Sequence, residues 1–499
     1  MTFLPVILWS DVLIWLLVVA AFLLGWLSSR NPPLRAAWRR VGRSRPGMAA
    51  ATVLIPFVLL GLLDSIHYRP RLENREVDKP AAYAIEVLSL LDAVAAPLRT
   101  RNEKTYSEPL ATRAYARESI EARDAEGRVR QLRDFPRLKH GGAHLGADEA
   151  RRDIDIAKQV LVAGALACLL WALMALACTY LLVRQGACPA SEAWRGLWRG
   201  ETEFAWNAVL ATLAVLLLCA LPLAALCVDY HVFGTDKVGQ DVLYQILKSV
   251  RTALVIGLVT TLVMLPLSIL LGIVAGYFRG WVDDLIQYLY TTLSSIPGVL
   301  LIAAAVLMMQ VLIDTHPQWF ATAAERADLR LLALCFILGV TSWTGLCRLL
   351  RGETLKLREL EYIQAAQAFG VADLRIVTRH ILPNLMHIVI IALVMDFSSL
   401  VLAEAVLSYV GIGVDPTMIS FGTMINNARM ELAREPTVWW SLAAAFTFMF
   451  ALVLAANLLA DAVRDAFDPR LAGAASPTPL RVGSAQGISS PISAKGGRA

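Results

Sequence analysis

Histidine and cysteine are the residues of this 499-residue chain whose spacing could hold a metal ion. The stretch HGGAH (140–144) places two histidines four residues apart. Further histidines that could join them are His67, His231 and His316. The glycines between His140 and His144 argue against a rigid helix that presents both rings, so solvated loop histidines are favoured over a metal site. The seven cysteines form no CxxC pair, and none lies in residues 67–153, so neither a zinc site nor a disulfide framework is predicted there.

Motifs that would give the chain an enzymatic activity are missing from the sequence. It contains no GxxxxGK[ST] phosphate-binding loop, no GxSxG nucleophile turn and no HExxH zinc motif. We therefore predict no catalytic residue and no cofactor in this chain. If ATP drives the process that the protein serves, another subunit must supply the ATPase.

Two carboxylates lie inside a long apolar run at 384–410. Asp396 falls near its middle and Glu404 in its outer half. Carboxylates within a bilayer are costly and usually face a cavity or bind a partner. Both are therefore candidates for a translocation path. For Asp396 the alternatives are a structural hydrogen bond or a protein contact, and for Glu404 a structural or gating role is favoured.

A polar and basic segment, EYIQAAQAFGVADLRIVTRHILPN (361–384), separates two apolar runs. Gly370 is a natural helix C-terminus, and Pro383 is suited to begin the next helix. Arg375 and Arg379 share one face at a spacing of four residues. The pattern predicts two short amphipathic helices across the membrane surface, with small residues at the bend that allow a second backbone to approach closely. A basic helix resting on lipid is the alternative.

Long apolar runs are the elements that must position these residues. The chain is 57% hydrophobic and 17% charged, whereas soluble domains carry roughly 25% charged residues. A run of about 20 apolar residues is long enough to cross the hydrocarbon core of a bilayer. The predicted spans are 4–27, 48–66, 155–183, 204–228, 250–277, 285–313, 329–349, 384–410 and 437–460. We therefore expect an all-α polytopic membrane protein with nine transmembrane helices.

Arginine placement predicts the orientation of these spans. The loop SSRNPPLRAAWRRVGRSRPG (28–47) is rich in arginine and has no acid, so it is predicted to be cytoplasmic. Alternation then places the N-terminus outside, the C-terminus inside and residues 361–384 inside. Residues 67–153 form a sizeable external segment, in which a helical stripe over 80–98 predicts a small helical cap. The net charge of +5 follows from this arginine pattern and indicates no nucleic-acid partner.

The spacing within the polar segment matches a known signature. The residues that carry the match are Ala365, Ala366, Gly370, Leu382 and Pro383. Their spacing resembles the cytoplasmic EAA signature of ABC-importer permeases, which reads E-A-A, three residues, G, nine residues, I, one residue, L-P. Gln364 stands where the signature has Glu, and His380 where it has Ile. The ending RHILPN (379–384) is similar to the peptide-importer branch of that family.

Four more stretches resemble the dipeptide, oligopeptide and nickel permeases of the "C" type. They are FGTDKVGQDVLYQILKSVRTALVIGL (233–258), GIVAGYFRGWVDDLIQYLYTTLSSIPGVLL (272–301), LAEAVLSYVGIGVDP (402–416) and SFGTMINNAR (420–429). They stand in the family's order and cover roughly 204–470. The first 200 residues lie outside the resemblance.

The resemblance implies a mechanism and a set of partners. The segment 357–383 would dock on a separate ATPase subunit through Gln364, Ala365, Ala366, Gly370, Arg375, Arg379, His380, Leu382 and Pro383. An external gate or a contact with a solute-binding protein would involve Gly234, Thr235, Asp236, Gly239 and Asp241. The implied partners in the bacterial inner membrane are a second permease of "B" type, two ATPase subunits that carry ATP and Mg, and a periplasmic solute-binding protein.

The predicted organisation follows from these assignments. It consists of a two-helix membrane segment (1–66), the external segment (67–153), a third span with a cytoplasmic linker (154–203), a six-helix permease core (204–470) and a disordered cytoplasmic tail (471–499). The predicted function is an importer permease for peptides or peptide-like solutes. Alternatives are an ABC-coupled exporter or envelope-response permease, and a proton-coupled carrier that uses Asp396, against which the EAA spacing argues.

Overall fold

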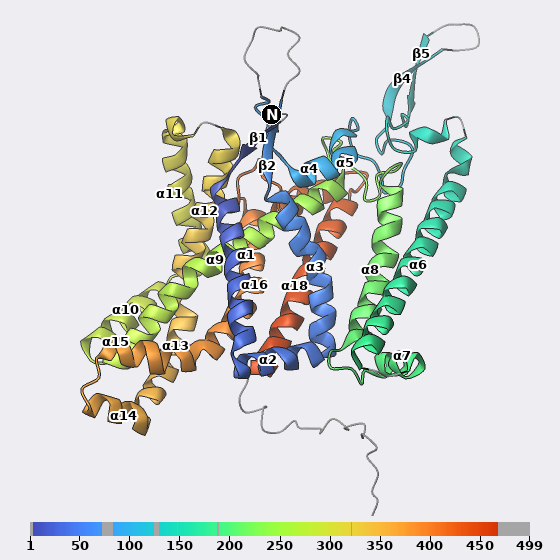
Figure 1. The fold of residues 1–499 in the computed structure, drawn as a ribbon. Coiled ribbons are helices and arrows are strands. Elements are labelled where there is room, and N and C mark those ends of the chain that lie inside the picture. The colour runs from blue at the N-terminus through green and yellow to red at the C-terminus, as the bar shows by residue number, and fades with distance from the viewer. Residues whose placement is uncertain are drawn as a thin grey trace, which may run out of the picture.

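The computed structural model describes residues 3–71, 83–123, 129–146, 148–186, 189–320 and 322–467. Its helices are α1 (Trp9–Arg30), α2 (Pro32–Arg43), α3 (Arg45–Asp64), α4 (Leu90–Val94), α5 (Ala96–Thr100), α6 (Arg152–Gly186), α7 (Ala190–Arg199), α8 (Trp206–Leu226), α9 (Val242–Phe278), α10 (Trp281–Ser295), α11 (Gly298–Thr315), α12 (Ala323–Ser342), α13 (Thr344–Arg358), α14 (Glu361–Ala368), α15 (Asp373–Ile376), α16 (Leu382–Val410), α17 (Phe421–Leu432) and α18 (Trp440–Phe467). Its strands are β1 (Phe3–Val6), β2 (His67–Pro70), β3 (Leu88–Ser89), β4 (Glu118–Arg123) and β5 (Val129–Asp134). All strands gather at one end of the molecule, here called the strand end, and α14 projects at the opposite end, the α14 end (Figure 1).

Nine helical stretches among the described residues are long and apolar enough to cross a membrane, as the sequence predicts. They are α1, α3, α6, α8, α9, α11, α12 with α13, α15 with α16, and α18. The prediction of a polytopic membrane protein built from helices is confirmed. The strands of the strand end are an addition that the hydrophobic pattern did not predict.

The sixth predicted span, 285–313, differs from the structure. A break at Ile296 and Pro297 divides it into α10 and α11, and α11 alone is apolar enough to span. Proline lacks an N–H and cannot continue a helical hydrogen-bond ladder, so the chain turns there. Asp283 on α10 binds Arg351 on α13 through two hydrogen bonds, of 2.5 and 2.7 Å, which holds α10 to the core at the α14 end.

The long helix α9 connects three hydrophobic clusters. At the strand end, Val242, Ile246 and Val250 pack with α17 and α18 and with Tyr106 from outside the helices. In the middle, Val255 and its neighbours pack with α1 and α12. At the α14 end, its last turns pack with α13, α14 and the start of α16. Because one helix contributes to all three clusters, the two ends of the molecule share a continuous packed element.

Buried charges join the N-terminal helices to α9. The Arg251 Nη2 atom donates hydrogen bonds to Asp11 Oδ1 (2.7 Å) and Ser10 Oγ (2.8 Å) on α1. Lys248, one helical turn earlier, binds Asp64 at the end of α3 (2.7 Å) and Asp92 of α4 (3.1 Å). Residues 1–66 are therefore integrated with the helices that follow residue 204. The five-segment partition of the sequence stays a prediction, and the predicted tail at 471–499 lies outside the described residues.

The segment 67–153 combines strands with single-turn helices. β1, β2 and β3 form an antiparallel sheet, and β4 pairs with β5 as a hairpin. The helical cap predicted over 80–98 is wrong in extent, because only α4 and α5 are helical and residues 80–82 lie outside the described residues. Ser89 pairs with His67 in the sheet and caps α4 in a reciprocal box with Asp92, so the helix cannot begin earlier. Pro97 stands in the first turn of α5 and starts a separate helix.

α6, α7 and α8 form a hairpin at the edge of the molecule (Figure 1). α8 packs against α3, and the indole N–H of Trp171 on α6 donates to the Leu210 carbonyl of α8 (2.9 Å). The two ends of the hairpin meet at the strand end. There, the Tyr230 hydroxyl donates to Asp155 (2.9 Å), and the Gly142 N–H donates to the Asp229 carbonyl (2.8 Å).

Candidate functional site

The segment around Gly370 forms a helix, a tight turn and a second helix at the α14 end. α14 ends at Ala368, and Gly370 adopts a left-handed backbone with φ of +73°. A β-carbon on this residue would meet no atom within 4 Å, so the backbone conformation rather than crowding is what favours glycine. α15 then continues through a π-turn (Val377–Ile381) into α16, which places Pro383 in the first turn of α16.

The inner face of this helix pair is fixed to the ends of α9 and α13. Ile363, Ile376 and Ile381 are completely buried in the cluster that these helices share. The Tyr277 hydroxyl at the end of α9 donates to Asp373 (2.7 Å) and accepts from Gln367 (3.2 Å). Asp373 therefore binds across to α9 and does not cap α15, whose N-cap is Ala372. The pair is held on both sides of its turn.

The outer face of the pair carries the predicted coupling residues. Gln364, Ala365, Gly370, Arg375, Arg379 and Pro383 are exposed, and Ala366, His380 and Leu382 are partly buried. Two large apolar side chains flank the turn on this face, Phe369 with 87% and Leu374 with 76% of its surface exposed. The sequence analysis singled out neither residue. The signal that could have found both is their position on either side of the glycine turn.

The two carboxylates of α16 have different surroundings. Glu404 is buried and accepts hydrogen bonds from Ser408 Oγ (2.6 Å) and Ser420 Oγ (2.9 Å). Because Ser420 caps α17, Glu404 ties the end of α16 to the start of α17. Asp396 is half-buried, and its side chain has no hydrogen-bond or ion-pair partner among the described residues. Of these two carboxylates, Asp396 is therefore the one whose side chain remains available to bind a group outside this chain.

The loop between α8 and α9 is covered by the segment 103–112. The Thr235 hydroxyl donates to the Thr105 carbonyl (2.9 Å) and accepts from the Ser107 N–H (2.7 Å). Gly239 has φ of +78°, and a β-carbon there would lie 1.9 Å from the Glu103 carbonyl oxygen, so the covering chain leaves no room for a side chain. These contacts join segment 67–153 to the helices. The loop 227–241 and the segment 103–112 that covers it are together called the seam.

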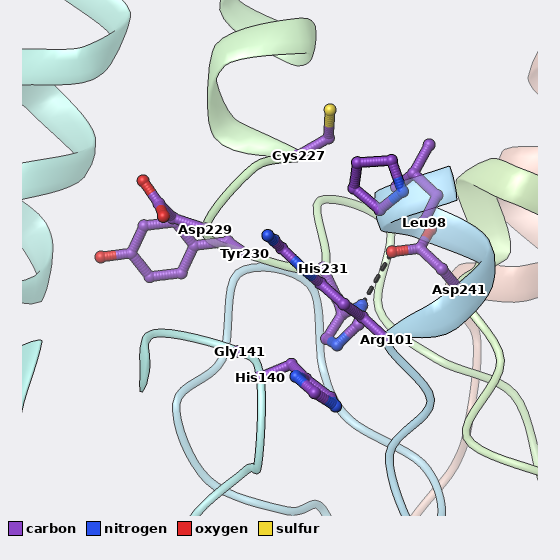
Figure 2. A pocket seen from close by; sticks show the side chains of 10 residues that line it. Leu98, Arg101, His140, Gly141, Cys227, Asp229, Tyr230, His231 and Asp241 are labelled. Carbon is purple, nitrogen blue, oxygen red and sulfur yellow. Dashed lines mark hydrogen bonds and ion pairs between the residues drawn. The ribbon is translucent and has the colours of Figure 1, made fainter. Parts of the chain in front are cut away.

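A buried charge cluster lies in this seam (Figure 2). His231 Nδ1 lies 2.7 Å from Asp241 Oδ2, and His231 Nε2 lies 3.4 Å from Glu103 Oε1. Burial alone would lower the pKa of His231, but the hydrogen bond to Asp241 and the nearby Glu103 carboxylate raise it to about 9. Burial alone would raise the pKa of Glu103, but His231 and the N–H groups of residues 139–141 lower it to about 2. The cluster is therefore one imidazolium between two carboxylates.

The predicted gate residues all belong to this seam. Gly234, Thr235, Gly239 and Asp241 are buried. Asp236 is half-buried, and its carboxylate accepts from the N–H groups of Val238 and Gln240 (both 2.9 Å) and from Gln245 (2.7 Å). In this conformation Gly234, Thr235 and Gly239 lie against segment 103–112. Their role in a gate or in a contact with a binding protein stays a prediction.

Within the described residues, no group of three or more metal-binding side chains is placed to hold a metal ion. His144, one of the two histidines of HGGAH, is instead hydrogen-bonded through Nε2 to Asp155 Oδ2 (2.9 Å) at the base of the α6–α8 hairpin. The other, His140, donates its backbone N–H to Glu103 (2.7 Å) in the seam. The two histidines therefore contact different acids.

Comparison with known proteins gives a family match over the second half of the chain. Residues 268–473 match the family described as "Binding-protein-dependent transport system inner membrane component". The glutathione transport system permease protein GsiD of Pectobacterium atrosepticum is 34% identical over 243 residues, which cover 48% of this chain and 73% of that protein. The oligopeptide transport system permease protein OppC of Mycobacterium tuberculosis is 30% identical over 239 residues, which cover 48% of this chain and 76% of that protein. The dipeptide transport system permease protein DppC of Bacillus subtilis is 29% identical over 245 residues, which cover 48% of this chain and 69% of that protein.

Proposed function

The chain belongs to the inner membrane components of binding-protein-dependent transport systems, and from that membership we propose that it forms part of the translocation path for peptides or peptide-like solutes. It is the permease subunit of an ABC importer in the inner membrane, and ATP is bound and hydrolysed by separate ATPase subunits. The relatives named above are permeases for glutathione, oligopeptides and dipeptides, which supports a peptide-like solute for this chain.

The observation that carries the proposal is the exposed apolar face of the helix pair at the α14 end. Phe369 and Leu374 stand on either side of the Gly370 turn, and exposed large apolar residues in such a pair mark a docking surface. The opposite face is fixed to α9 and α13 through Tyr277 and Ile376. A displacement of the docked pair must therefore move the ends of the spans, as rigid elements do in a two-state transition.

Orientation and a second permease complete the proposal. The α14 end carries the arginine-rich α2, so it faces the cytoplasm, and the strand end, with the N-terminus, faces the periplasm (Figure 1). A solute-binding protein delivers the solute at the strand end. A second permease of "B" type packs beside this chain, and Asp396 binds a polar group of that subunit or of the solute at mid-membrane.

A pair of substitutions at Gly370 tests the coupling role. Asn and Asp have nearly the same size and both tolerate the left-handed backbone, so Gly370→Asn and Gly370→Asp differ mainly in charge. A new carboxylate must be desolvated if a partner docks at the turn. We expect the Asp variant to reach normal abundance, to retain about tenfold less ATPase subunit in a pull-down and to lose ATP-driven uptake of trialanine by proteoliposomes. The Asn variant should retain most of the ATPase subunit in the pull-down and most of the trialanine uptake.

The proton-carrier alternative predicts a different pattern for the same measurements. Uptake would then follow the proton gradient, depend on Asp396 and need no ATPase subunit. Trialanine uptake without ATP that survives Gly370→Asp would therefore refute the coupling role.

A further inference from the structure

A hollow of about 220 Å³ opens at the strand end beside the last turns of α17. It is lined by Tyr106, Lys237, Asn427, Met430, Glu431 and Arg434. Three parts of the chain meet there, namely the segment 103–107, the loop before α9 and α17. Pockets for drug-sized ligands have volumes of roughly 300–1,000 Å³, so this hollow can hold one end of a short peptide but not a large solute.

Glu431, a buried residue that lines this hollow, has one carboxylate oxygen without a partner among the described residues. Glu431 has 5% of its surface exposed, and its Oε1 atom accepts from the Tyr106 hydroxyl (3.3 Å). Its Oε2 atom is buried and has no hydrogen-bond partner among the described residues. A buried polar atom left unpaired is costly, so the arrangement points to a bound group. Burial and the nearby Asp236 carboxylate raise the pKa of Glu431 above its usual value.

The exposed charges of the lining are both positive. Lys237 and Arg434 are exposed at its rim, and the Arg434 guanidinium lies 5.4 Å from the centre of the Tyr106 ring. The nearby Asp236 carboxylate already accepts three hydrogen bonds from its own loop and α9. Among the lining residues the two cations are exposed and the carboxyl of Glu431 is buried, so an anion that enters the hollow meets the cations first. The Asn427 amide supplies a further donor.

We propose that this hollow binds the terminal carboxylate of a short peptide. Lys237 and Arg434 provide the charge, the Asn427 amide provides a hydrogen-bond donor, and the unpaired Glu431 oxygen can accept from an N–H of the peptide. A carboxylate between two cations forms charge-assisted hydrogen bonds, which are stronger than those between neutral groups. The inference rests on the proposed function, because peptides are the solute class assigned there. Tyr106 lies outside the part of the chain that matches the permease family, so this wall of the hollow comes from segment 67–153.

The test uses the purified complex of both permeases and the ATPase subunits, without the solute-binding protein. Binding of trialanine, trialanine amide and N-acetyl-trialanine is measured by titration calorimetry. We expect trialanine and its N-acetyl form to bind within about twofold of each other, and the amide to bind at least about tenfold more weakly. Lys237→Gln and Arg434→Gln should each weaken trialanine binding at least about fivefold. Arg429→Gln is the matched control, because Arg429 lies on α17 but stacks on Tyr409 outside the hollow.

Several outcomes would overturn this carboxylate site. They are equal binding of trialanine and its amide, equal binding by Arg434→Gln and Arg429→Gln, tighter binding of the amide, and no binding of trialanine at millimolar concentration. ATP-driven uptake of the same peptides is measured separately in proteoliposomes. If the wild-type complex binds trialanine in the expected pattern and takes up no peptide, the carboxylate site stands and the proposed function fails.

Discussion

His231 shows at the residue scale how a titratable group can fasten two segments together. It lies between Asp241, which caps α9, and Glu103, which comes from the covering segment 103–112. The sequence pointed to His231 as an external histidine and to Asp241 as a motif residue. It gave no signal for Glu103, because a contact between segments so far apart in the chain leaves no local periodicity.

The cluster makes the attachment of the covering segment depend on pH. The pKa of His231 is raised from 6.5 to about 9. The stability that the protonated His231 contributes to the folded protein is therefore complete below pH 6.5 and is lost as the pH rises through about 9. The pKa of Glu103 is lowered from 4.5 to about 2, so its stabilisation is complete above pH 4.5 and is lost as the pH falls towards 2. Hydrogen exchange of the amides of residues 139–141, corrected for intrinsic rates, should accelerate at least about tenfold between pH 6.5 and 9.5.

The control for this prediction is His231→Gln, in which the acceleration between pH 6.5 and 9.5 should disappear. Exchange at these amides that is equally fast at both pH values in the wild-type protein would show that His231 does not fasten the segment.

At the scale of elements, the helix pair at the α14 end was predictable and its contacts were not. Gly370 marks its turn by a local rule, since few other residues adopt a left-handed backbone without strain. The same local rules wrongly extended the sixth span through Pro297 and a helix over 80–98. Pro297 in the first case, and the helix cap at Ser89 in the second, interrupt the helix although the apolar residues continue at helical spacing. Tertiary contacts such as Tyr277 with Asp373 have no sequence signature at all.

The attachment of α1 depends on a buried ion pair and can be tested by substitution. Asp11→Leu leaves the Arg251 guanidinium buried without its carboxylate and also removes the partner of His67. Removal of one member of a buried pair destabilises proteins by about 3–5 kcal/mol. We therefore expect a clearly lower midpoint of thermal denaturation in detergent, and partial recovery when Arg251→Met is added.

Phe22→Ala is the matched control on the same helix, because Phe22 has 76% of its surface exposed. Exposed substitutions usually change stability by no more than about 0.5 kcal/mol. If Asp11→Leu and Phe22→Ala denature at the same temperature, the ion pair does not anchor α1.

At the scale of the whole molecule, the lengths of the apolar runs were sufficient to predict nine spans, whereas the orientation drawn from arginine placement stays a prediction. Apolar length is a strong signal because a bilayer imposes a minimum on every crossing. The part that could not be predicted is the strand end, where short strands and single-turn helices depend on pairing between distant segments. Segment 67–153 consequently contributes Tyr106 to the main hydrophobic cluster, which no charge count indicates.

Orientation is tested with reporter fusions. A phosphatase or fluorescent reporter joined near residue 40, within α2, should give a cytoplasmic signal, and one near residue 120 should give a periplasmic signal. The physical reason is the arginine excess around α2. A cytoplasmic signal near residue 120 would contradict both the nine-span order and the placement of the carboxylate site on the periplasmic face.

The α6–α8 hairpin leaves the strand end and returns to the same place, where Tyr230 meets Asp155 and Gly142 meets Asp229. The hairpin crosses the membrane twice and returns to the side on which it began. The gain or loss of both helices together would therefore leave the orientation of every later span unchanged. α8 packs against α3, and Leu223 on α8 also packs in a cluster with Leu98 on α5 and Leu243 on α9. Loss of the hairpin would therefore remove the packing along α8 and leave the orientation of every later span as it was.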